Sequence, residues 1–264
     1  MLSFARLGRP ELGRLGNQLF QVSFITNFAH KFNIDYKIPY WRYAEYIDHK
    51  FNFSLGLSKL NYDLVVEEPS LGYHEDFFLN HLPEIRDKRV NIATGYFQSY
   101  KYFTKQHVLK VFRFNDKFKS IKIDPSKSVA ISVRRGDFVL HPHFNNIEAG
   151  AFKAVLKNFK KHKVFVFTDD FNYCKNEFTG PQYEFMEGLN DIEQLITMSK
   201  FELFILSNST FSYWGPMLNP DTKKVWYPYY MFPDLNRCKL YNEIYWPQES
   251  DIYVPYMNPI NKML

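Results

Sequence analysis

Cysteine is scarce in this chain of 264 residues, and long apolar runs are absent from it. The two cysteines, Cys174 and Cys238, form no Cys-x-x-Cys pair, which excludes a disulfide-rich scaffold and favours a reducing compartment. Residues 1–13 contain no apolar segment of the signal-peptide kind, and no run is long enough to span a bilayer. We therefore expect a cytoplasmic protein without a transmembrane segment, and peripheral association with a membrane face stays open.

The chain also lacks a glycine-rich phosphate loop of the Gly-x-Gly-x-x-Gly or Walker type after any expected strand. This absence argues against a dinucleotide-dependent oxidoreductase and against an ATPase. The net charge of +5 is mild and the lysines are scattered, so nucleic-acid binding is not favoured. A small anionic ligand suits this charge balance better.

Apolar patterning predicts an α/β fold in two halves. Residues 2–7 alternate as a strand would, and a glycine-containing loop then leads to a helix from Leu19, in which phenylalanines recur every four residues. The second half alternates strands and helices more regularly, which is typical of a parallel, doubly wound sheet. Because the polar segment 113–127 is the best candidate linker, we expect domains over residues 1–125 and 126–264.

Polar side chains follow three strands of the expected C-terminal sheet, and the carboxyl ends of parallel strands share one edge. Arginine forks match phosphate oxygens, and hydroxyls and N–H groups at a helix start cradle phosphate. A neighbouring carboxylate can accept two hydrogen bonds from a guanine-type base, so the pattern favours a nucleoside diphosphate as ligand. The groups concerned are Arg134 and Arg135 after residues 129–133, Asp169 and Asp170 after 163–168, and residues 207–210 after 201–206.

Other interpretations of these residues stay open. The arginine pair also suits a surface turn closed by a salt bridge to Asp137. Asp169 and Asp170 also suit a helix N-cap or a divalent metal site, although the arginines could neutralise phosphate without a metal. Near the N-terminus, Asn17 stands about where the cap of the first helix is expected, where it either caps the helix or receives a polar ligand.

Six segments occur in order along the chain: GRLGNQLFQ, TGYFQSYKYF, ISVRRGDF, VFTDDFNYC, DIEQLITMSKFELFILSNSTFSYWG and KVWYP. Together they resemble the α-1,2-fucosyltransferase family, glycosyltransferase family eleven, from near the N-terminus to about Pro228. RRGD also resembles part of the His-x-Arg-Arg-x-Asp motif shared by the α-1,2-, α-1,6- and O-fucosyltransferases. The resemblance implies a GT-B type fold with two Rossmann-like halves, GDP-fucose as donor, inversion at the sugar carbon, and no metal or other cofactor.

The resemblance also implies roles for individual residues. Arg134, Asp137 and Asn17 are the expected catalytic residues, with Arg134 on the β-phosphate. Asp137 is either the general base or a residue that only orients the arginines. Asp170 is expected to read guanine. The expected donor-binding residues, which lie at strand ends or helix starts, are Arg134, Arg135, Asp170, Asn208, Ser209, Thr210, Phe211 and Gly16.

The expected reaction is transfer of L-fucose from GDP-β-L-fucose to a galactose-terminated glycan, in α-1,2 linkage, with the acceptor against the N-terminal domain. This sequence departs from the family pattern at three positions. Ser132 replaces the motif histidine, Arg14 replaces a glycine of the N-terminal loop, and Tyr213 replaces one tryptophan of a tandem pair. The alternatives are a same-fold enzyme that uses another nucleotide sugar or hydrolyses it, and a non-catalytic sugar-nucleotide or glycan-binding protein, which only Ser132 favours.

Overall fold

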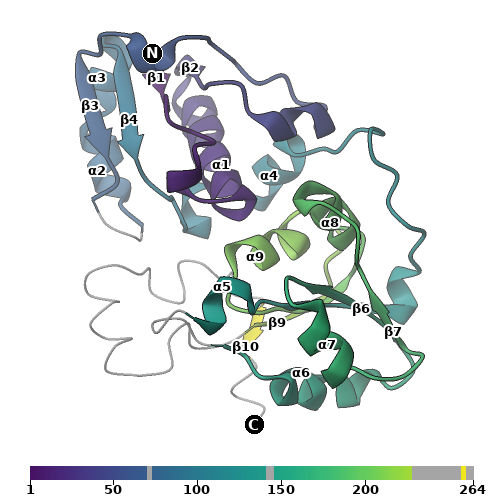
Figure 1. The fold of residues 1–264 in the computed structure, drawn as a ribbon. Helices are drawn as coiled ribbons and strands as arrows, with labels where there is room; N and C mark the ends of the chain where they lie inside the picture. Colours follow the sequence, from purple (N-terminus) through teal and green to yellow (C-terminus); the bar gives the residue numbers. More distant parts are fainter. Residues whose placement is uncertain (70–72, 141–145, 228–256, 260–264) are drawn as a thin grey trace. The chain divides into compact units, whose positions relative to one another are not determined.

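The computed structural model describes residues 1–69, 73–140, 146–227 and 257–259. These residues form two compact units, Met1–Lys117 and residues 118–227 with 257–259, and each contains its own parallel sheet (Figure 1). The division after Lys117 lies close to the boundary expected after residue 125. Cys238 lies outside the described residues. No helix within the described ranges is long and apolar enough to cross a membrane.

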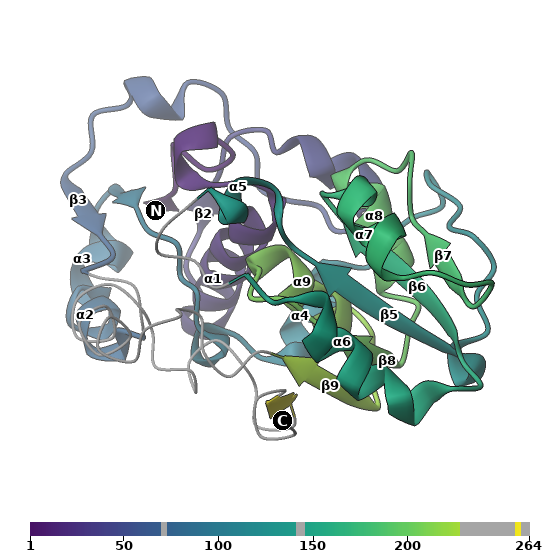
Figure 2. The same cartoon turned by 60° about the horizontal axis from the view of Figure 1, so that its bottom comes forward.

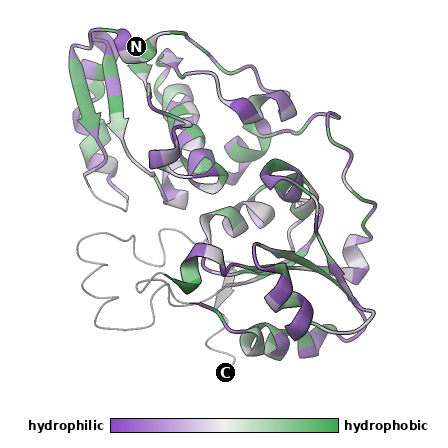
Figure 3. Cartoon of the chain, in the orientation of Figure 1, coloured by the Kyte–Doolittle hydropathy of each residue, from purple (hydrophilic) through white to green (hydrophobic). Residues whose placement is uncertain are grey.

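The N-terminal unit is built on a four-stranded sheet of order β2-β1-β4-β3, in which all neighbours are parallel. Figure 3 shows β3 and β4 to be predominantly hydrophobic, although in β3 only Val66 is buried and Val65 is exposed. The strands are β1 (Leu2–Ser3), β2 (Tyr36–Lys37), β3 (Leu64–Glu67) and β4 (Val90–Thr94). The α-helices are α1 (Leu15–Phe32), α2 (Glu75–Asn80), α3 (Leu82–Asp87) and α4 (Lys105–Val111).

Helix α1 begins earlier than the phenylalanine repeat indicates. Its first residue is Leu15, so Gly16 and Asn17 lie in the first turn, and Arg14 occupies the N-cap position without a side-chain hydrogen bond. The expected start at Leu19 and the interpretation of Asn17 as the cap are therefore wrong. The repeat begins at Phe20, and the first turn contains no phenylalanine. The first strand is likewise shorter than expected.

The C-terminal unit is built on a six-stranded sheet of order β10-β9-β8-β5-β6-β7, again with parallel neighbours. Figure 2 shows β8, β5 and β6 running side by side. The strands are β5 (Ser128–Val133), β6 (Lys163–Thr168), β7 (Tyr183–Phe185), β8 (Leu203–Ile205), β9 (Lys224–Tyr227) and β10 (Met257–Pro259). The α-helices are α5 (Gly136–Val139), α6 (Ala149–Leu156), α7 (Phe171–Glu177), α8 (Asp191–Met198) and α9 (Thr210–Met217).

Helices cover both faces of this sheet, which confirms the doubly wound arrangement that the sequence predicts. Alternate residues of β5 point to opposite faces. Val129 and Ile131 pack into the core formed with α6 and α7, while Ser132 lies on the opposite face, against Ser212 of α9. Helices α8 and α9 approach each other closely, since a Cβ at Gly215 would lie 2.6 Å from the sulfur of Met198.

Candidate functional site

Strand register brings the ends of β5 and β6 together at the carboxyl edge of the C-terminal sheet. Val133 and Thr168, the last residues of these strands, lie opposite each other. The next residue of each strand, Arg134 and Asp169, therefore come face to face, and Arg134 Nη1 lies 2.5 Å from Asp169 Oδ2. The side-by-side placement of the arginine pair and the aspartate pair is thus as the sequence predicts.

Arg134 is held between two carboxylates. Nη1 pairs with Asp169, and Nη2 donates a hydrogen bond to Asp137 Oδ1. The guanidinium also lies 5.2 Å from the centre of the Phe138 ring. The Arg134 side chain is only 17% exposed, whereas that of Asp137 is 60% exposed. Two contacts in different directions fix the orientation of the guanidinium plane, which a single surface salt bridge would not do.

Arg135 is fixed by a different set of neighbours. Its backbone N–H donates to Asp169 Oδ1 at 2.8 Å, and its Nε donates to Asp170 Oδ2 at 3.4 Å. The guanidinium stacks 3.5 Å from the centre of the Tyr173 ring, and the Tyr173 hydroxyl donates to Glu148 Oε2 at 3.0 Å. Stacking and hydrogen bonding together restrict the conformation of the Arg135 side chain. Arg135 therefore stabilises the loop at least as much as it provides positive charge for a ligand.

The two aspartates have separate structural tasks. Asp170 caps α7, because its Oδ1 accepts the N–H of Tyr173 at 3.1 Å, so the N-cap interpretation is confirmed as part of its role. Asp169 holds the turn of Arg134 and Arg135 with both oxygens. It also explains the glycine that follows the arginines, since a Cβ at Gly136 would lie 2.4 Å from Asp169 Oδ2. Sequence reasoning named Asp169 without assigning it this task; the glycine after the arginine pair is the signal for it.

The ion pairs of this cluster join two guanidinium groups to four carboxylates, those of Asp137, Asp169, Asp170 and the exposed Glu148. The summed formal charge, +2 from the arginines and −4 from the carboxylates, is −2. Anion binding at this edge would therefore depend on N–H donors that are aimed in advance rather than on an excess of positive charge. A ligand phosphate would compete with the carboxylates, and the exposed Asp137 would give way more readily than Asp169.

The third strand end lies beside the first. The N–H of Ser207, after β8, donates to the carbonyl of Ser132 in β5 at 2.9 Å. Ser209 caps α9, with its Oγ accepting the N–H of Phe211 at 3.3 Å, and Thr210 is the first residue of the helix. Asn208 is buried, whereas Ser209, Thr210 and Phe211 are half-buried. The expected convergence of three strand ends is observed; their roles toward a donor remain predictions.

In the N-terminal unit, Asn17 lies against the loop that precedes its helix. A Cβ at Gly13, where φ is +98°, would lie 2.1 Å from Asn17 Nδ2, so the amide fills the space that glycine leaves open. Gln98 Nε2 donates to Asn17 Oδ1 at 3.1 Å. Gly16 is buried in the first turn of α1. Asn17 and Gly16 belong to the N-terminal unit, where Asn17 contacts Gln98, and their expected role with Arg134 stays a prediction.

A strained turn holds Gln98 in place. Phe97 adopts the left-handed backbone conformation with φ +53°, which is costly for a residue with a side chain. Its ring stacks on that of Phe24 with centroids 4.0 Å apart. Glu68 Oε2 accepts the N–H groups of Tyr96 at 2.7 Å and of Phe97 at 3.1 Å. The sequence analysis assigned no role to Glu68 or to Gln98, although Gln98 lies in the segment TGYFQSYKYF, because both act through contacts distant in the chain.

Burial raises the pKa of Glu68 to about 7, against the lowering effects of its backbone hydrogen bonds and of Tyr102. The folded state therefore keeps a proton that the unfolded state releases near pH 4.5, and the stability from this group declines as pH rises from about 4.5 to 7. Glu68→Gln, which stays neutral, should be more stable than wild type at pH 8, by about 2–4 kcal/mol, and similar at pH 5. Urea unfolding of wild type and Glu68→Gln at pH 5 and pH 8 measures these stabilities. A stability difference between variant and wild type that is the same at both pH values would contradict the raised pKa of Glu68.

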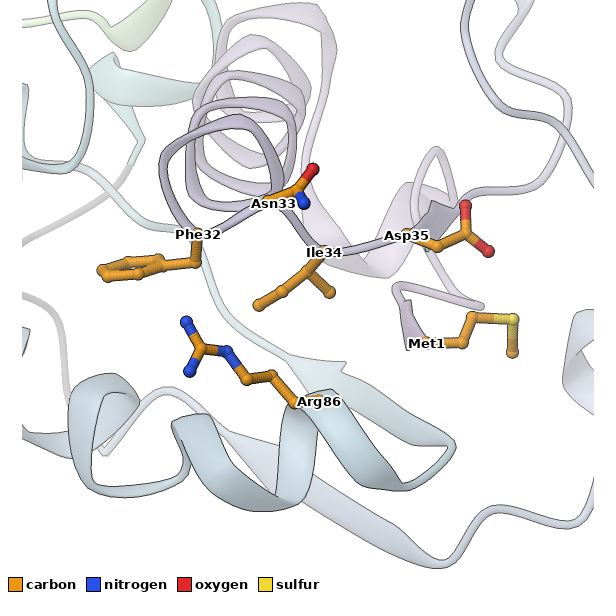
Figure 4. A pocket seen from close by; sticks show the side chains of 6 residues that line it. All are labelled: Met1, Phe32, Asn33, Ile34, Asp35 and Arg86. Carbon is orange, nitrogen blue, oxygen red and sulfur yellow. The ribbon is translucent and has the colours of Figure 1, made fainter.

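A surface pocket of about 450 Å³ lies elsewhere, at the amino ends of β1 and β2. In Figure 4 the side chain of Arg86 reaches from α3 toward Phe32, the last residue of α1. Ligands of parallel α/β sheets bind at the opposite, carboxyl edge. The pocket is therefore not the candidate active site. Its lining residues are Met1, Phe32, Asn33, Ile34, Asp35 and Arg86.

Comparison of the sequence with models of known protein families identifies the family of this chain. The family model described as "Glycosyl transferase family 11" matches residues 11–247, which include most of both units and the ends of β5, β6 and β8. The chain belongs to glycosyltransferase family 11. The family assignment that the six segments predict is thus confirmed, and the protein is a glycosyltransferase of that family.

Relatives of this family 11 member include two proteins of Escherichia coli. One is named alpha-1,2-colitosyltransferase and is 26% identical over 254 residues, with 78% of this chain and 85% of that protein covered. The other is named O-antigen biosynthesis glycosyltransferase WbnK and is 23% identical over 198 residues, with 61% and 65% covered. The match thus spans slightly less than two thirds of the second relative.

A solved structure of similar fold is a mutant of FUT1 from Arabidopsis thaliana in complex with GDP. It has a TM-score of 0.54 at 12% identity, and the match covers 89% of this chain and 70% of that one. At this identity the likeness shows the fold alone. The expected GT-B type fold, with two Rossmann-like halves and parallel sheets, is confirmed for this family 11 member.

Proposed function

We propose that this family 11 enzyme transfers L-fucose from GDP-β-L-fucose to a hydroxyl of a galactose-terminated glycan, in α-1,2 linkage with inversion. The observation that carries the proposal is Arg134, a guanidinium clamped by Asp137 and Asp169 at the carboxyl edge of a parallel sheet. The family, the α-1,2 linkage in the name of the first E. coli relative and the GDP in the FUT1 complex support it.

In this mechanism the acceptor hydroxyl attacks the anomeric carbon while the bond to the diphosphate breaks, so the β-linked donor gives an α-linked product and GDP. Negative charge builds up on the β-phosphate in a transition state of oxocarbenium character. Arg134 would stabilise that charge with N–H groups already oriented. Arg135 and the α9 start, with Asn208, Ser209, Thr210 and Phe211, would hold the rest of the donor, and Asp170 the guanine. Asp137 is the candidate that accepts the proton of the attacking hydroxyl.

We propose further that no metal or other cofactor takes part. The carboxylates of Asp169 and Asp170, the alternative metal ligands, already accept hydrogen bonds from the turn and from the α7 backbone. Neutralisation of the leaving diphosphate is assigned to Arg134 and to N–H donors at the sheet edge. Transfer measured in excess EDTA should therefore equal transfer without it, and activity restored only by an added divalent cation would contradict this part of the proposal.

Acceptor-dependent release of GDP tests the reaction itself. The purified chain is incubated with GDP-fucose and a panel of β-galactosides, and GDP and fucosylated product are quantified together. We expect GDP and product in equal amounts and only with acceptor. GDP release without acceptor would indicate a hydrolase, and GDP binding without turnover would indicate a binding protein.

A second candidate donor is suggested by the name of one relative, alpha-1,2-colitosyltransferase, which denotes transfer of colitose and not of fucose. The present chain would then transfer another deoxy sugar with the same stereochemistry and the same use of Arg134. Competition between GDP-fucose and the corresponding colitose donor, at equal concentration and with one acceptor, separates the two. We expect the fucosylated product to predominate.

A further inference from the structure

Three buried serines form a chain of hydroxyl groups behind the candidate phosphate site. Ser132 Oγ of β5 lies 2.6 Å from Ser212 Oγ of α9, and Ser212 Oγ lies 3.2 Å from Ser207 Oγ. Ser132 is 6% exposed, and the other two are each 1% exposed. We call Ser132, Ser207 and Ser212 the serine relay. Buried hydroxyls that bond to one another in this way restrict the positions of the elements that carry them.

The serine relay joins the three parts that meet at the sheet edge. Ser132 lies two residues before Arg134 on a rigid strand, and Ser212 lies in the first turn of α9, two residues after Thr210. Ser207 lies in the loop between β8 and α9, and its N–H is bound to the Ser132 carbonyl at 2.9 Å. The relay therefore fixes how far the start of α9 stands from the strand that carries Arg134.

We propose that Ser132 is a positioning residue, which acts through Ser212 to set the spacing between Arg134 and the start of α9, and that this spacing determines the affinity for the nucleoside diphosphate. The inference rests on the proposed function, because it takes these two elements to hold one diphosphate. It assigns a task to the position where the sequence departs from the family motif.

The burial of Ser132 argues against direct contact between its side chain and a donor. Its hydroxyl is directed at Ser212, on the α9 side of β5, with an oxygen–oxygen distance of 2.6 Å. A larger side chain at this position would meet Ser212 in the first turn of α9. The next turn of the helix packs closely against α8 and β8, since a Cβ at Gly215 would lie 2.6 Å from Met198 Sδ and 3.2 Å from Phe204 Cε1. A histidine placed here would displace the helix start, so the role of the motif histidine is not supplied from this position.

A double-mutant cycle on GDP affinity tests the proposal by calorimetric titration. Ser132→Ala and Ser212→Ala should each weaken GDP binding about 3- to 10-fold, the range expected for loss of one buried hydrogen bond. The double variant should be no weaker than the weaker single variant, because both changes break the same link. Ser132→His should weaken GDP binding more than Ser132→Ala does.

Ser199→Ala is the matched control in the same unit. Ser199 is also buried, and its hydroxyl donates to the Ile196 carbonyl of its own helix at 2.8 Å. Its loss should lower the melting temperature about as much as Ser132→Ala and leave GDP affinity unchanged. Additive losses in the double variant, unchanged affinity in Ser132→Ala, or improved binding in Ser132→His would each overturn the positioning role. A wild-type chain that does not bind GDP would instead overturn the proposed function, and this inference with it.

Discussion

Arg134→Lys is expected to lower kcat/KM for fucosyl transfer by about 100-fold, and Arg134→Ala by somewhat more, the cost of losing one charge-stabilising donor in the transition state. Lysine retains the charge but not the planar fork that reaches Asp169 and Asp137 from Nη1 and Nη2. Steady-state kinetics with GDP-fucose and a saturating β-galactoside measure the effect. The loss should appear mainly in kcat, because the donor's leaving group is stabilised most as the bond breaks.

Arg113→Lys supplies the control for this substitution. Arg113 pairs with Asp48 at 3.3 Å in the N-terminal unit and is 79% exposed. Exposed pairs of this kind contribute little, so its kinetics should match wild type. Near-normal transfer by Arg134→Lys would show that the fork geometry is not used, and near-normal transfer by Arg134→Ala would remove Arg134 from the site.

Asp169→Asn is expected to lower kcat/KM by about 30- to 100-fold, within the range for a lost partner of a half-buried charge. The asparagine oxygen can still accept the Arg135 N–H, so the turn should fold, but the amide no longer balances the Arg134 guanidinium. The same kinetic assay measures the loss, and circular dichroism checks the fold. Activity within a few-fold of wild type would show that Asp169 does not orient Arg134.

Asp137→Asn is the informative comparison, because it removes the other carboxylate that contacts Arg134. Asp137 is 60% exposed and Asp169 is 27% exposed. If Asp137 only orients the arginine, its loss should cost about fivefold or less, as exposed pairs do. If it is the general base, kcat should fall about 100-fold or more. Equal losses at both positions would favour the base assignment.

The strands of the C-terminal sheet could be predicted from the sequence because they are short apolar runs followed by polar residues. Strands β5 and β6 match the expected segments almost residue for residue, since both are buried on both faces. The parallel register then makes the neighbours of their last residues predictable, which is why the meeting of Arg134 with the aspartate pair could be anticipated.

The carboxylates that surround Arg134 and Arg135 could not be predicted from the sequence. Sequence reasoning treated Arg134 and Arg135 as cations awaiting an anion, whereas the structure shows both engaged by carboxylates. A salt bridge to Asp137 was one open interpretation of the turn, and that contact is present. Which of several nearby carboxylates contacts which guanidinium depends on tertiary packing, because the local sequence fixes only their order along the chain.

The N-terminal unit was harder to predict for a physical reason. Its site-forming contacts join residues far apart in the chain: Gln98 reaches Asn17, and Glu68 holds the turn at Phe97. The left-handed conformation of Phe97 contradicts local propensity and is stabilised by ring stacking and a buried carboxylate. Tertiary contacts that stabilise a locally unfavourable conformation leave no periodic signal in the sequence.

The most direct test of the account is the preference of the chain for GDP over GMP, measured by calorimetry with wild type and Arg134→Ala. If Arg134 binds the β-phosphate, wild type should prefer GDP by about tenfold or more, the value of one charge-assisted contact. Arg134→Ala should bind both nucleotides equally, with GMP affinity close to that of wild type. Equal affinities in wild type, or a preference for GDP that survives the substitution, would contradict the claim that Arg134 at the sheet edge holds the diphosphate of a sugar nucleotide.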